Sequence, residues 1–432
     1  MTPEPLPTLT AAICMFSILL VPLAAAGLAI INAGLSRSRN AAHMMLASLC
    51  VIAVAAGVYF MCGFGFQGFT GEAAYAAVVG GKQWDWIAAE PWFFRGLKTS
   101  GVSTGLAAWL GMLSAGLVAL IPLGAGGGRW RLGAICMSTA MLAGWTYPLF
   151  AHWAWDGWLA QLGVNFGLGR GFTDAGGAGG IHVVGGLTAL SMAWILGPRR
   201  GKFSAAGTPA AIPGHDFVFV LFGCMLALTG WLGLNSAGSI LLAGVVQPDT
   251  IVASSINTIL AAGAGLLGAA LITRARYGKP DVSLSANGWV AGLVASSAGC
   301  GLVAPAAAVI IGAVAGSLAV WSVEWLELRF GVDDPGGAIS VHALGGIWGL
   351  LAIGCFDRLP GSTGSGQWLA QLIGVATLVG FVLPLTYGLN WLLNLISPQR
   401  VPPDGERQGM DLHELGASAY PELASHLEDF TP

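Results

Sequence analysis

Two histidines, each preceded by an aspartate and followed by paired glycines, are the residues of this chain best suited to chemistry. The two segments are Asp174-Ala-Gly-Gly-Ala-Gly-Gly-Ile-His182-Val-Val-Gly-Gly-Leu187 and Asp334-Pro-Gly-Gly-Ala-Ile-Ser-Val-His342-Ala-Leu-Gly-Gly-Ile347. Both fit the pattern D-x-G-G-A-x-x-x-H-x-x-G-G-[L/I], with eight residues from aspartate to histidine. Ionisable groups in apolar helices usually have a function, and glycines allow a second helix to approach closely. We therefore expect the two histidines to meet.

Histidine pairs occur in metal sites, haem sites, structural cores and pores. Zinc requires three or four ligands, and neither segment offers a cysteine or a further carboxylate at ligand spacing. Bundle cytochromes usually carry two histidine pairs, whereas the repeated pattern supplies one. A lone histidine in a membrane helix is often structural, but its repetition in one frame argues against that. We favour a pore lined by imidazole, with no metal and no cofactor.

The two aspartates have a structural interpretation beside the functional one. Each precedes an apolar segment, where its carboxylate can accept backbone N–H groups and complement the positive helix end. For Asp334 the capping interpretation is the stronger one, because Pro335 follows at a first-turn position. At Asp174 a carboxylate at the mouth of a pore would also lower the energy of an arriving cation.

A third group of polar and aromatic residues is Tyr147-Pro-Leu-Phe-Ala-His152-Trp153-Ala-Trp155-Asp156-Gly-Trp158. Tryptophans near a membrane surface usually act as belt anchors, and we expect at least two of these to do so. An indole face also attracts a desolvated cation by about 0.5 to 2 kcal/mol. One such ring near Asp174 would create a cation-recruiting vestibule.

The composition indicates the setting in which these residues act. The chain has 432 residues, of which 55 % are hydrophobic, 9 % are charged and 66 are glycine, and its mean hydropathy is +0.73. Soluble proteins have about 25 % charged residues, so this is a polytopic membrane protein. No basic cluster interleaved with aromatic residues is present, which excludes nucleic-acid binding. The amino terminus lacks the basic region of a signal peptide, and we expect it to be retained.

Because about 20 apolar residues cross a bilayer, the hydropathy pattern predicts an all-α integral membrane protein with eleven spans. The predicted spans are Thr10–Ala33, Ala41–Gly65, Thr104–Leu123, Leu132–Ala151, Gly177–Leu196, His215–Asn235, Ile251–Thr273, Ser285–Gly301, Ala304–Leu326, Ala338–Phe356 and Trp368–Leu395. The segment from Gln67 to Thr99 contains no recognisable motif and is predicted to cap the outer face.

Charge bias predicts the orientation of these spans. With the amino terminus outside, the inner segments hold thirteen of the eighteen Lys and Arg residues, as the positive-inside rule requires. Residues 1–397 then form the membrane domain, and residues 398–432 form a cytoplasmic tail. Spans one to five and six to ten would form an inverted repeat, followed by a long eleventh helix, with a transport site between the two units. Because Asp174 falls outside and Asp334 inside, we do not expect the two acids to share one role.

Several motifs resemble the Amt branch of the ammonium transporter/Rh family, and the resemblance covers nearly the whole chain. They are Ala33-Gly34-Leu35-Ser-Arg37-Ser-Arg39-Asn40, Tyr147-Pro…Ala151-His-Trp…Trp155, Asp174…His182, Gly230-Trp231-Leu-Gly233-Leu-Asn235, Asn257-Thr258, Asp333-Asp334-Pro335…His342-Ala-Leu-Gly-Gly, and Glu406-x-x-Gly409-x-Asp411…Ala419-Tyr420. The resemblance implies a homotrimer in the cell membrane with one pore per subunit. It assigns Trp155 as the cation–π residue, Asp174 as the outer acid, and His182 with His342 as the pore pair.

The chain departs from the family pattern at several positions. Leu110, Ser114 and Leu234 stand where family members carry phenylalanines, so we expect a wider outer path, unless Phe93, Phe94 or Trp109 compensates. Gly238 replaces the serine of the family's cation site, which leaves Ser236 and Ser239 as candidates. The inner motif A-E-R is Gly127-Gly128-Arg129, and the tail has Leu415 and Ala417 in place of polar residues.

The resemblance implies that ammonium is recruited outside and deprotonated, and that ammonia passes along the imidazoles. Potassium has no proton to lose and would be excluded. An ammonium sensor and an Rh-like electroneutral gas channel remain alternatives, whereas no residue pattern supports an enzyme. In the tail, Glu406, Gly409, Asp411 and Tyr420 fit the family's docking pattern. A PII-type signal protein is a predicted cytoplasmic partner, with weakened binding, and we expect order in the tail to about Tyr420.

Overall fold

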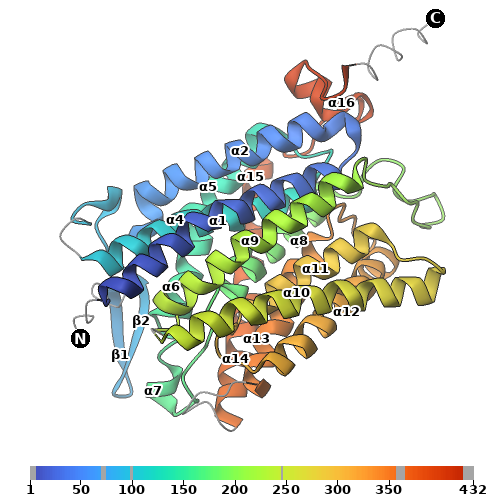
Figure 1. Ribbon diagram of the computed structural model, residues 1–432. Coiled ribbons are helices and arrows are strands. Elements are labelled where there is room, and N and C mark those ends of the chain that lie inside the picture. Colours follow the sequence, from blue (N-terminus) through green and yellow to red (C-terminus); the bar gives the residue numbers. More distant parts are fainter. Residues whose placement is uncertain (1–5, 70–73, 98–100, 245–246, 357–364, 422–432) are drawn as a thin grey trace, which may run out of the picture.

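The computed structural model describes residues 6–69, 74–97, 101–244, 247–356 and 365–421. Long helices run side by side, with both strands at one end of the bundle and α16 at the other (Figure 1). The α-helices are α1 (Thr8–Leu35), α2 (Ala41–Val58), α3 (Phe64–Gln67), α4 (Val102–Gly126), α5 (Leu132–Met141), α6 (Tyr147–Trp155), α7 (Leu162–Phe166), α8 (Val184–Leu196), α9 (Phe217–Leu241), α10 (Pro248–Tyr277), α11 (Val282–Ser296), α12 (Pro305–Phe330), α13 (Gly345–Phe356), α14 (Ser365–Thr377), α15 (Leu383–Ile396) and α16 (Pro403–Gln408).

Ten helical stretches in the described part of the chain are long and apolar enough to cross a membrane. They match ten of the eleven predicted spans, and the prediction of an all-α membrane protein is confirmed. The remaining span is shorter than predicted: α11 ends at Ser296, and turns replace the expected helix up to Gly301. Ser296 and Ser297 bond to the carbonyl of Leu293, which offers the backbone an alternative to helix continuation.

Several spans contain a π-helical segment where a wider turn interrupts the α-helix. Two of them, Leu142–Thr146 and Leu378–Val382, lie just before Pro148 and Pro384. Proline has no N–H to donate and its ring collides with the preceding turn, so the helix widens there. Two others, Ala178–Val183 and Ile339–Leu344, contain His182 and His342.

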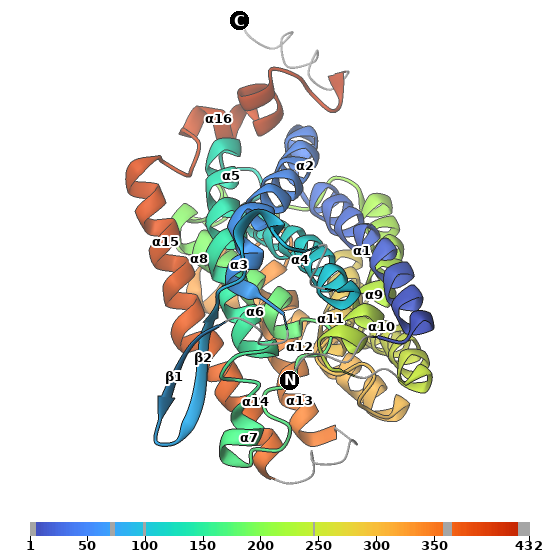
Figure 2. The ribbon, with the colours of Figure 1, turned by 90° about the vertical axis from the view of Figure 1, so that its left-hand side faces the viewer.

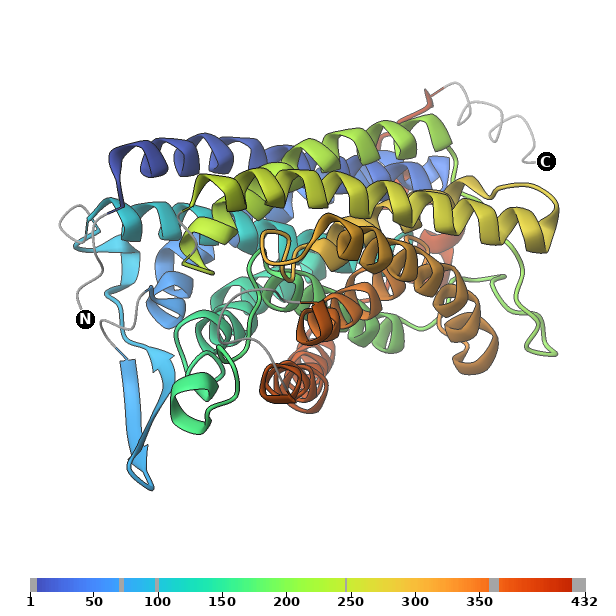
Figure 3. The ribbon, with the colours of Figure 1, turned by 60° about the horizontal axis from the view of Figure 1, so that its bottom comes forward.

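The segment predicted only as an outer cap contains a β-hairpin that the sequence analysis did not anticipate. Strand β1 (Ala74–Val79) pairs antiparallel with β2 (Lys82–Ala88), and a bulge lies between Tyr75 and Ala76. The hairpin projects away from the helical bundle (Figures 2 and 3). The indole N–H of Trp153 in α6 donates to the carbonyl of Trp86, which anchors β2 to the bundle.

Small residues allow the spans to pack closely. Helix α1 lies along α9, where a Cβ on Gly27 would come within 2.6 Å of backbone atoms of Gly223 and Ala227. Helices α10, α11 and α12 pack in the same way through Gly265 and Gly288, whose missing side chains let backbones touch. Burial of apolar surface contributes little to helix association in lipid. Close backbone contact supplies van der Waals energy instead.

Candidate functional site

The two histidines meet inside the bundle, as predicted. The Nδ1 atoms of His182 and His342 lie 3.3 Å apart, and the side chains are 0 % and 4 % exposed. One Nδ1 must carry a hydrogen and the other must accept it, because two donors or two acceptors would repel. The ring of Trp231 stacks on His182 with centroids 5.0 Å apart and planes inclined by 8°. The pair therefore has a fixed orientation on an apolar wall.

Paired glycines explain how the histidine helices come so close. A Cβ on Gly186 of α8 would overlap the backbone of Ala343, next to His342. Reciprocally, a Cβ on Gly346 of α13 would lie 2.6 Å from a methyl of Val183, next to His182. In each repeat, the second glycine of the pair thus leaves room for the residue that follows the histidine of the other repeat. The spacing from histidine to glycine is set by this crossing.

The first half of the motif builds the start of each histidine helix. Asp174 Oδ2 accepts the N–H groups of Gly179 and Gly180 at 3.0 and 2.9 Å. Asp334 accepts the N–H groups of Ala338 and Ile339 at 3.0 and 2.7 Å. These bonds satisfy donors that a helix start leaves free.

A glycine three residues after each aspartate completes this start. Gly177 has φ +86° and Gly337 has φ +67°, values that side chains disfavour. Both acids are therefore helix caps, in line with the capping interpretation, and the expectation that they do not share one functional role stays a prediction. The repeated motif therefore specifies the same backbone turn in both copies, although the two helices cross the membrane in opposite directions.

Trp155 and Asp174 are brought together, as predicted. The indole N–H of Trp155 donates to the main-chain carbonyl of Asp174 at 2.8 Å, and the ring lies over Gly180. Asp174 is only 3 % exposed, and its Oδ1 has no hydrogen-bond partner among the described residues. An acceptor oxygen thus lies free beside a partly exposed aromatic ring.

The two candidate serines differ in their surroundings. Both serines are buried in α9. The hydroxyl of Ser239 lies 3.6 Å from Sγ of Cys300, which belongs to the turns that follow α11. Gly238, on the same helix, packs against the segment that precedes the His182 helix, since a Cβ on Gly238 would overlap the carbonyl oxygen of Ala175. A role of either serine in recruitment stays a prediction.

The positions that lack the family's phenylalanines are tightly packed. Leu110, Ser114 and Leu234 are each at most 2 % exposed, so none of these three side chains is open to solvent. Phe94 packs against Tyr59, Phe60 and Phe64 at the outer end of the second span, and Phe93 contacts Phe60. The wider path stays a prediction for a conducting state.

Beside His342 the structure reveals two asparagines that the sequence analysis missed. A cavity of about 20 Å³ is lined by His342, Ala338 and Val341 together with Asn32 and Asn287. Asn287 also lines a cavity of about 490 Å³ that is bounded by inner-face loops. Asn287 therefore lines both the chamber beside His342 and the larger vestibule. Polar residues in the first and eighth spans were the available signal.

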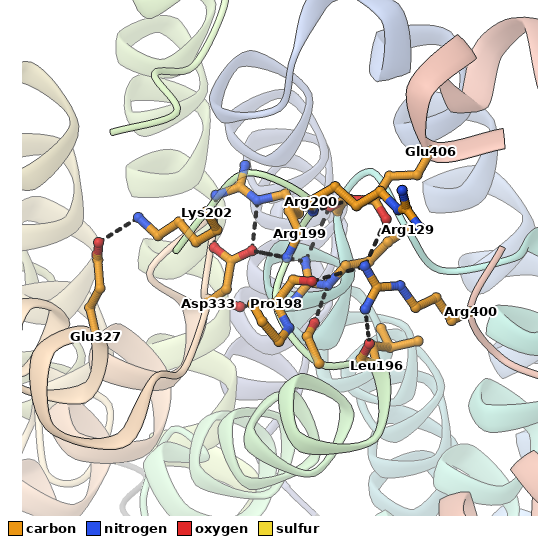
Figure 4. Close-up of polar contacts among 12 residues, drawn as sticks. Arg129, Leu196, Pro198, Arg199, Arg200, Lys202, Glu327, Asp333, Arg400 and Glu406 are labelled. Atoms are coloured by element: carbon orange, nitrogen blue, oxygen red, sulfur yellow. Dashed lines mark hydrogen bonds and ion pairs between the residues drawn. The ribbon is translucent and has the colours of Figure 1, made fainter. Parts of the chain in front are cut away.

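A network of charges joins the ends of several spans on the side where the tail lies (Figure 4). The Arg199 side chain makes two 2.8 Å bonds to Asp333, and Arg129 lies 3.8 Å from the same carboxylate. Lys202 pairs with Glu327, and Arg400 pairs with Glu406 at 2.7 Å. Burial alone would raise the pKa of Asp333, but the bonds and charge of Arg199 and the charge of Arg129 outweigh it and lower the pKa to about 2.

The tail docks under the bundle through the four predicted residues. Glu406, which is 1 % exposed, accepts the N–H of Arg200 as well as the Arg400 bond. Asp411 accepts the N–H groups of Ala42 and His43 at the start of α2. Gly409, with φ +101°, passes close to Arg39, and the Tyr420 hydroxyl lies 2.9 Å from His215 Nε2.

Glu414 is a tail contact that the sequence analysis missed. Its Oε2 accepts the N–H of Leu132 at the start of α5 and lies 3.1 Å from His43 Nε2. Gly128, where an acid was noted as absent, has φ +77° and contacts Asn40. The expectation that the tail is ordered to about Tyr420 stays a prediction, and the residues beyond Pro421 lie outside the described part of the chain.

Comparison with known proteins adds an independent line of argument. A model of the Ammonium Transporter Family matches residues 11–420. The chain is 38 % identical over 429 residues to Ammonium transporter Amt2 of Archaeoglobus fulgidus, covering 95 % of this chain and 87 % of that protein. It is 30 % identical over 415 residues to an ammonium transporter of Bacillus subtilis, with coverages of 94 % and 96 %.

Solved structures show the same fold. The chain superposes on a structure described as "Sensor Amt Protein" with a TM-score of 0.85 and 27 % identity, covering 94 % of this chain and 98 % of that one. The TM-score with Mep2 of Candida albicans is 0.78 at 22 % identity, with coverages of 96 % and 91 %. Together with the family match over nearly the whole length, these findings show that the chain belongs to the ammonium transporter family, a family of transporters and not of enzymes.

Proposed function

We propose that this protein moves ammonium across a membrane by passing ammonia between His182 and His342. The observation that carries the proposal is the buried imidazole pair, with Nδ1 atoms 3.3 Å apart, at the crossing of the two repeated helices. A bare cation entering such an enclosed, weakly polar space would lose its hydration at a cost of several kcal/mol or more. Neutral ammonia avoids most of that cost, and potassium cannot become neutral. Neutral imidazoles suit ammonia because each can donate and accept a hydrogen bond.

Trp155 and Asp174 recruit the cation in this mechanism. The indole ring attracts ammonium through its π face, and the Asp174 carboxylate lowers the energy of the arriving charge. Loss of one proton then releases ammonia toward His182, and the proton either stays outside or is relayed separately. The ring and carboxyl group lie at one end of the histidine helix, which supports this order of events.

The test is transport by the purified, reconstituted chain. Solid-supported-membrane electrophysiology should record currents with ammonium and none with potassium, and His182→Ala should abolish them. Uptake without current would favour electroneutral conduction, as in the gas-channel alternative. Ammonium binding without current or uptake would reject the transport proposal.

The similarity to a structure described as "Sensor Amt Protein" favours a sensor as the second candidate. In that function ammonium would occupy the site beside Trp155 and alter the docked tail without crossing. Ammonium-dependent protection of the tail from protease, in a chain that carries no flux, would support this alternative. Flux with no change in the tail would exclude it.

We further propose that the chain forms a homotrimer in the cell membrane with its amino terminus outside and its tail in the cytoplasm. The grouping of Arg129, Arg199 and Arg400 at the end where the tail docks supports this orientation. A PII-type protein would approach the same face. Cross-linking of purified protein and protease access in oriented vesicles test assembly and orientation separately.

A further inference from the structure

The inner vestibule is lined by five acidic residues, Asp281, Glu324, Glu327, Asp333 and Asp334, whose charges are not equally compensated. Glu324 pairs with Arg276 at 2.7 Å, Glu327 pairs with Lys202, and Asp333 pairs with Arg199. Asp334 lines the same cavity, yet its two oxygens meet only backbone N–H groups, those of Ala338 and Ile339. The residue is partly exposed, and each carboxylate oxygen retains a free lone pair.

Asp334 also stands at the inner end of the route to the histidines. Gly337, three residues later, contacts the carboxamide of Asn287, and Asn287 borders both the vestibule and the 20 Å³ chamber beside His342. A chamber of that size holds about one small polar molecule. Ammonia that leaves His342 therefore passes Asn287 and enters the vestibule beside Asp334.

The repeat gives this position a counterpart. Asp174 and Asp334 cap equivalent helix starts, each a short distance before a pore histidine, but at opposite ends of the route. Asp174 is nearly enclosed, whereas Asp334 faces a cavity of about 490 Å³. The geometry thus supplies a carboxyl group at each mouth, and the inner one is the more accessible.

We propose that Asp334 forms an inner cation site, at which ammonia arriving from His342 is protonated and held as ammonium before release. The inference rests on the proposed transport function and deepens it. The carboxyl O–H of Asp334 breaks as the ammonia lone pair takes the proton, which leaves a carboxylate paired with ammonium. Ammonium then departs into the vestibule, and a proton from cytoplasmic water restores the carboxyl group.

The surroundings of Asp334 suit proton exchange near neutral pH. Desolvation raises the pKa of this carboxyl to about 6, although the N–H groups of Ile339 and Ala338 act to lower it. That value already includes the charge of Asp333, which acts to raise the pKa, and the charge of Arg129, which acts to lower it. An acid poised in this range both gives up and regains a proton readily.

Vesicles of known sidedness test the proposal. Half-saturating ammonium concentrations are measured for wild type, Asp334→Asn and Asp281→Asn, in right-side-out and everted membrane vesicles. Asp281 is a matched control, because it lines the same vestibule and caps α11 through the N–H of Leu284. An amide keeps a capping oxygen at either position but carries no charge and supplies no acidic proton.

We expect Asp334→Asn to raise the half-saturating concentration in everted vesicles on the order of fivefold, as loss of one partly exposed charge interaction predicts. The value in right-side-out vesicles, and both values for Asp281→Asn, should match wild type. An unchanged everted value in Asp334→Asn, or an equal change in both directions with a lower melting temperature, would overturn the proposal. Absence of flux in wild type would instead refute the transport function itself.

Discussion

At the scale of single residues, the same side chains serve structure and chemistry. Asp174 fastens the start of the His182 helix through Gly179 and Gly180, and its other oxygen stays free beside Trp155. A helix cap contributes about 0.5 to 2 kcal/mol, which by itself would account for the presence of an aspartate. The capping role does not explain the free oxygen or the neighbouring aromatic ring.

Replacing Asp174 separates these two roles. Asp174→Ala should remove ammonium currents and lower stability by about 0.5 to 2 kcal/mol, because two N–H groups lose their acceptor. Asp174→Asn keeps an acceptor oxygen, so it should melt close to wild type but still lose most of the current. Currents and melting temperatures of the purified variants check both points, and wild-type currents in Asp174→Asn would leave the residue with capping alone.

The neighbouring Trp155 should show a milder effect. A cation–π contact contributes about 0.5 to 2 kcal/mol, so Trp155→Leu should raise the half-saturating ammonium concentration by roughly two- to thirtyfold. The maximal current should change less than the half-saturating concentration. A complete loss of current at saturating ammonium would show instead that the indole has a role beyond recruitment.

At the scale of elements, the crossing of the two histidine helices depends on glycine. The backbones touch where Gly186 meets Ala343 and where Gly346 meets Val183. The tail depends on a second kind of contact, in which acidic side chains cap the starts of α2 and α5. In both kinds of contact, a small or polar group lies where two elements meet.

Adding one methyl group tests the crossing. Gly186→Ala should push the helices apart and cost about 1 to 3 kcal/mol, because its Cβ would overlap backbone that cannot move aside. Gly263→Ala in α10 is the control, since nothing lies within 4 Å of that Cβ and alanine favours helix. Melting temperature and ammonium current should fall together in Gly186→Ala only, and equal behaviour of the two variants would contradict the crossing argument.

Removing one acid tests the docked tail. Asp411→Ala should free the tail, because the N–H groups of Ala42 and His43 lose their acceptor, and trypsin should then cut at Arg407 faster than in wild type. Asp404→Ala provides the control, since its side chain is 91 % exposed and pairs only with nearby Arg407. A cleavage rate in Asp411→Ala equal to that of the control would mean that other contacts hold the tail.

At the scale of the whole molecule, Asp333 links the ends of the fourth, fifth and tenth spans through Arg129 and Arg199. Its pKa of about 2 lies below the value near 3.9 of an unfolded chain. The stabilisation is therefore present above about pH 4 and is lost as the pH falls toward 2. Breaking a buried pair of this kind from one side typically costs about 3 to 5 kcal/mol.

Asp333→Asn should accordingly lower the melting temperature clearly at pH 7. The difference in melting temperature between this variant and wild type should narrow between pH 4 and pH 2, because protonated Asp333 no longer differs in charge from asparagine. Thermal unfolding in detergent across this range gives the measurement, with exposed Asp404→Asn as the control. A gap that stays constant down to pH 2 would show that the carboxylate contributes through shape and not through charge.

The sequence alone determined the class of the molecule, ten of its eleven spans and the meeting of His182 with His342. Span length and a repeated motif are local properties, readable without knowing which segments touch. Only the tertiary structure decided that Asn287 lines both cavities and that Glu414 contacts His43 and Leu132. The β-hairpin escaped prediction as well, because its strands are stabilised by aromatic and main-chain contacts with distant helices. Each of these features depends on groups far apart in the chain, and their proximity is set by helix packing that no single segment encodes.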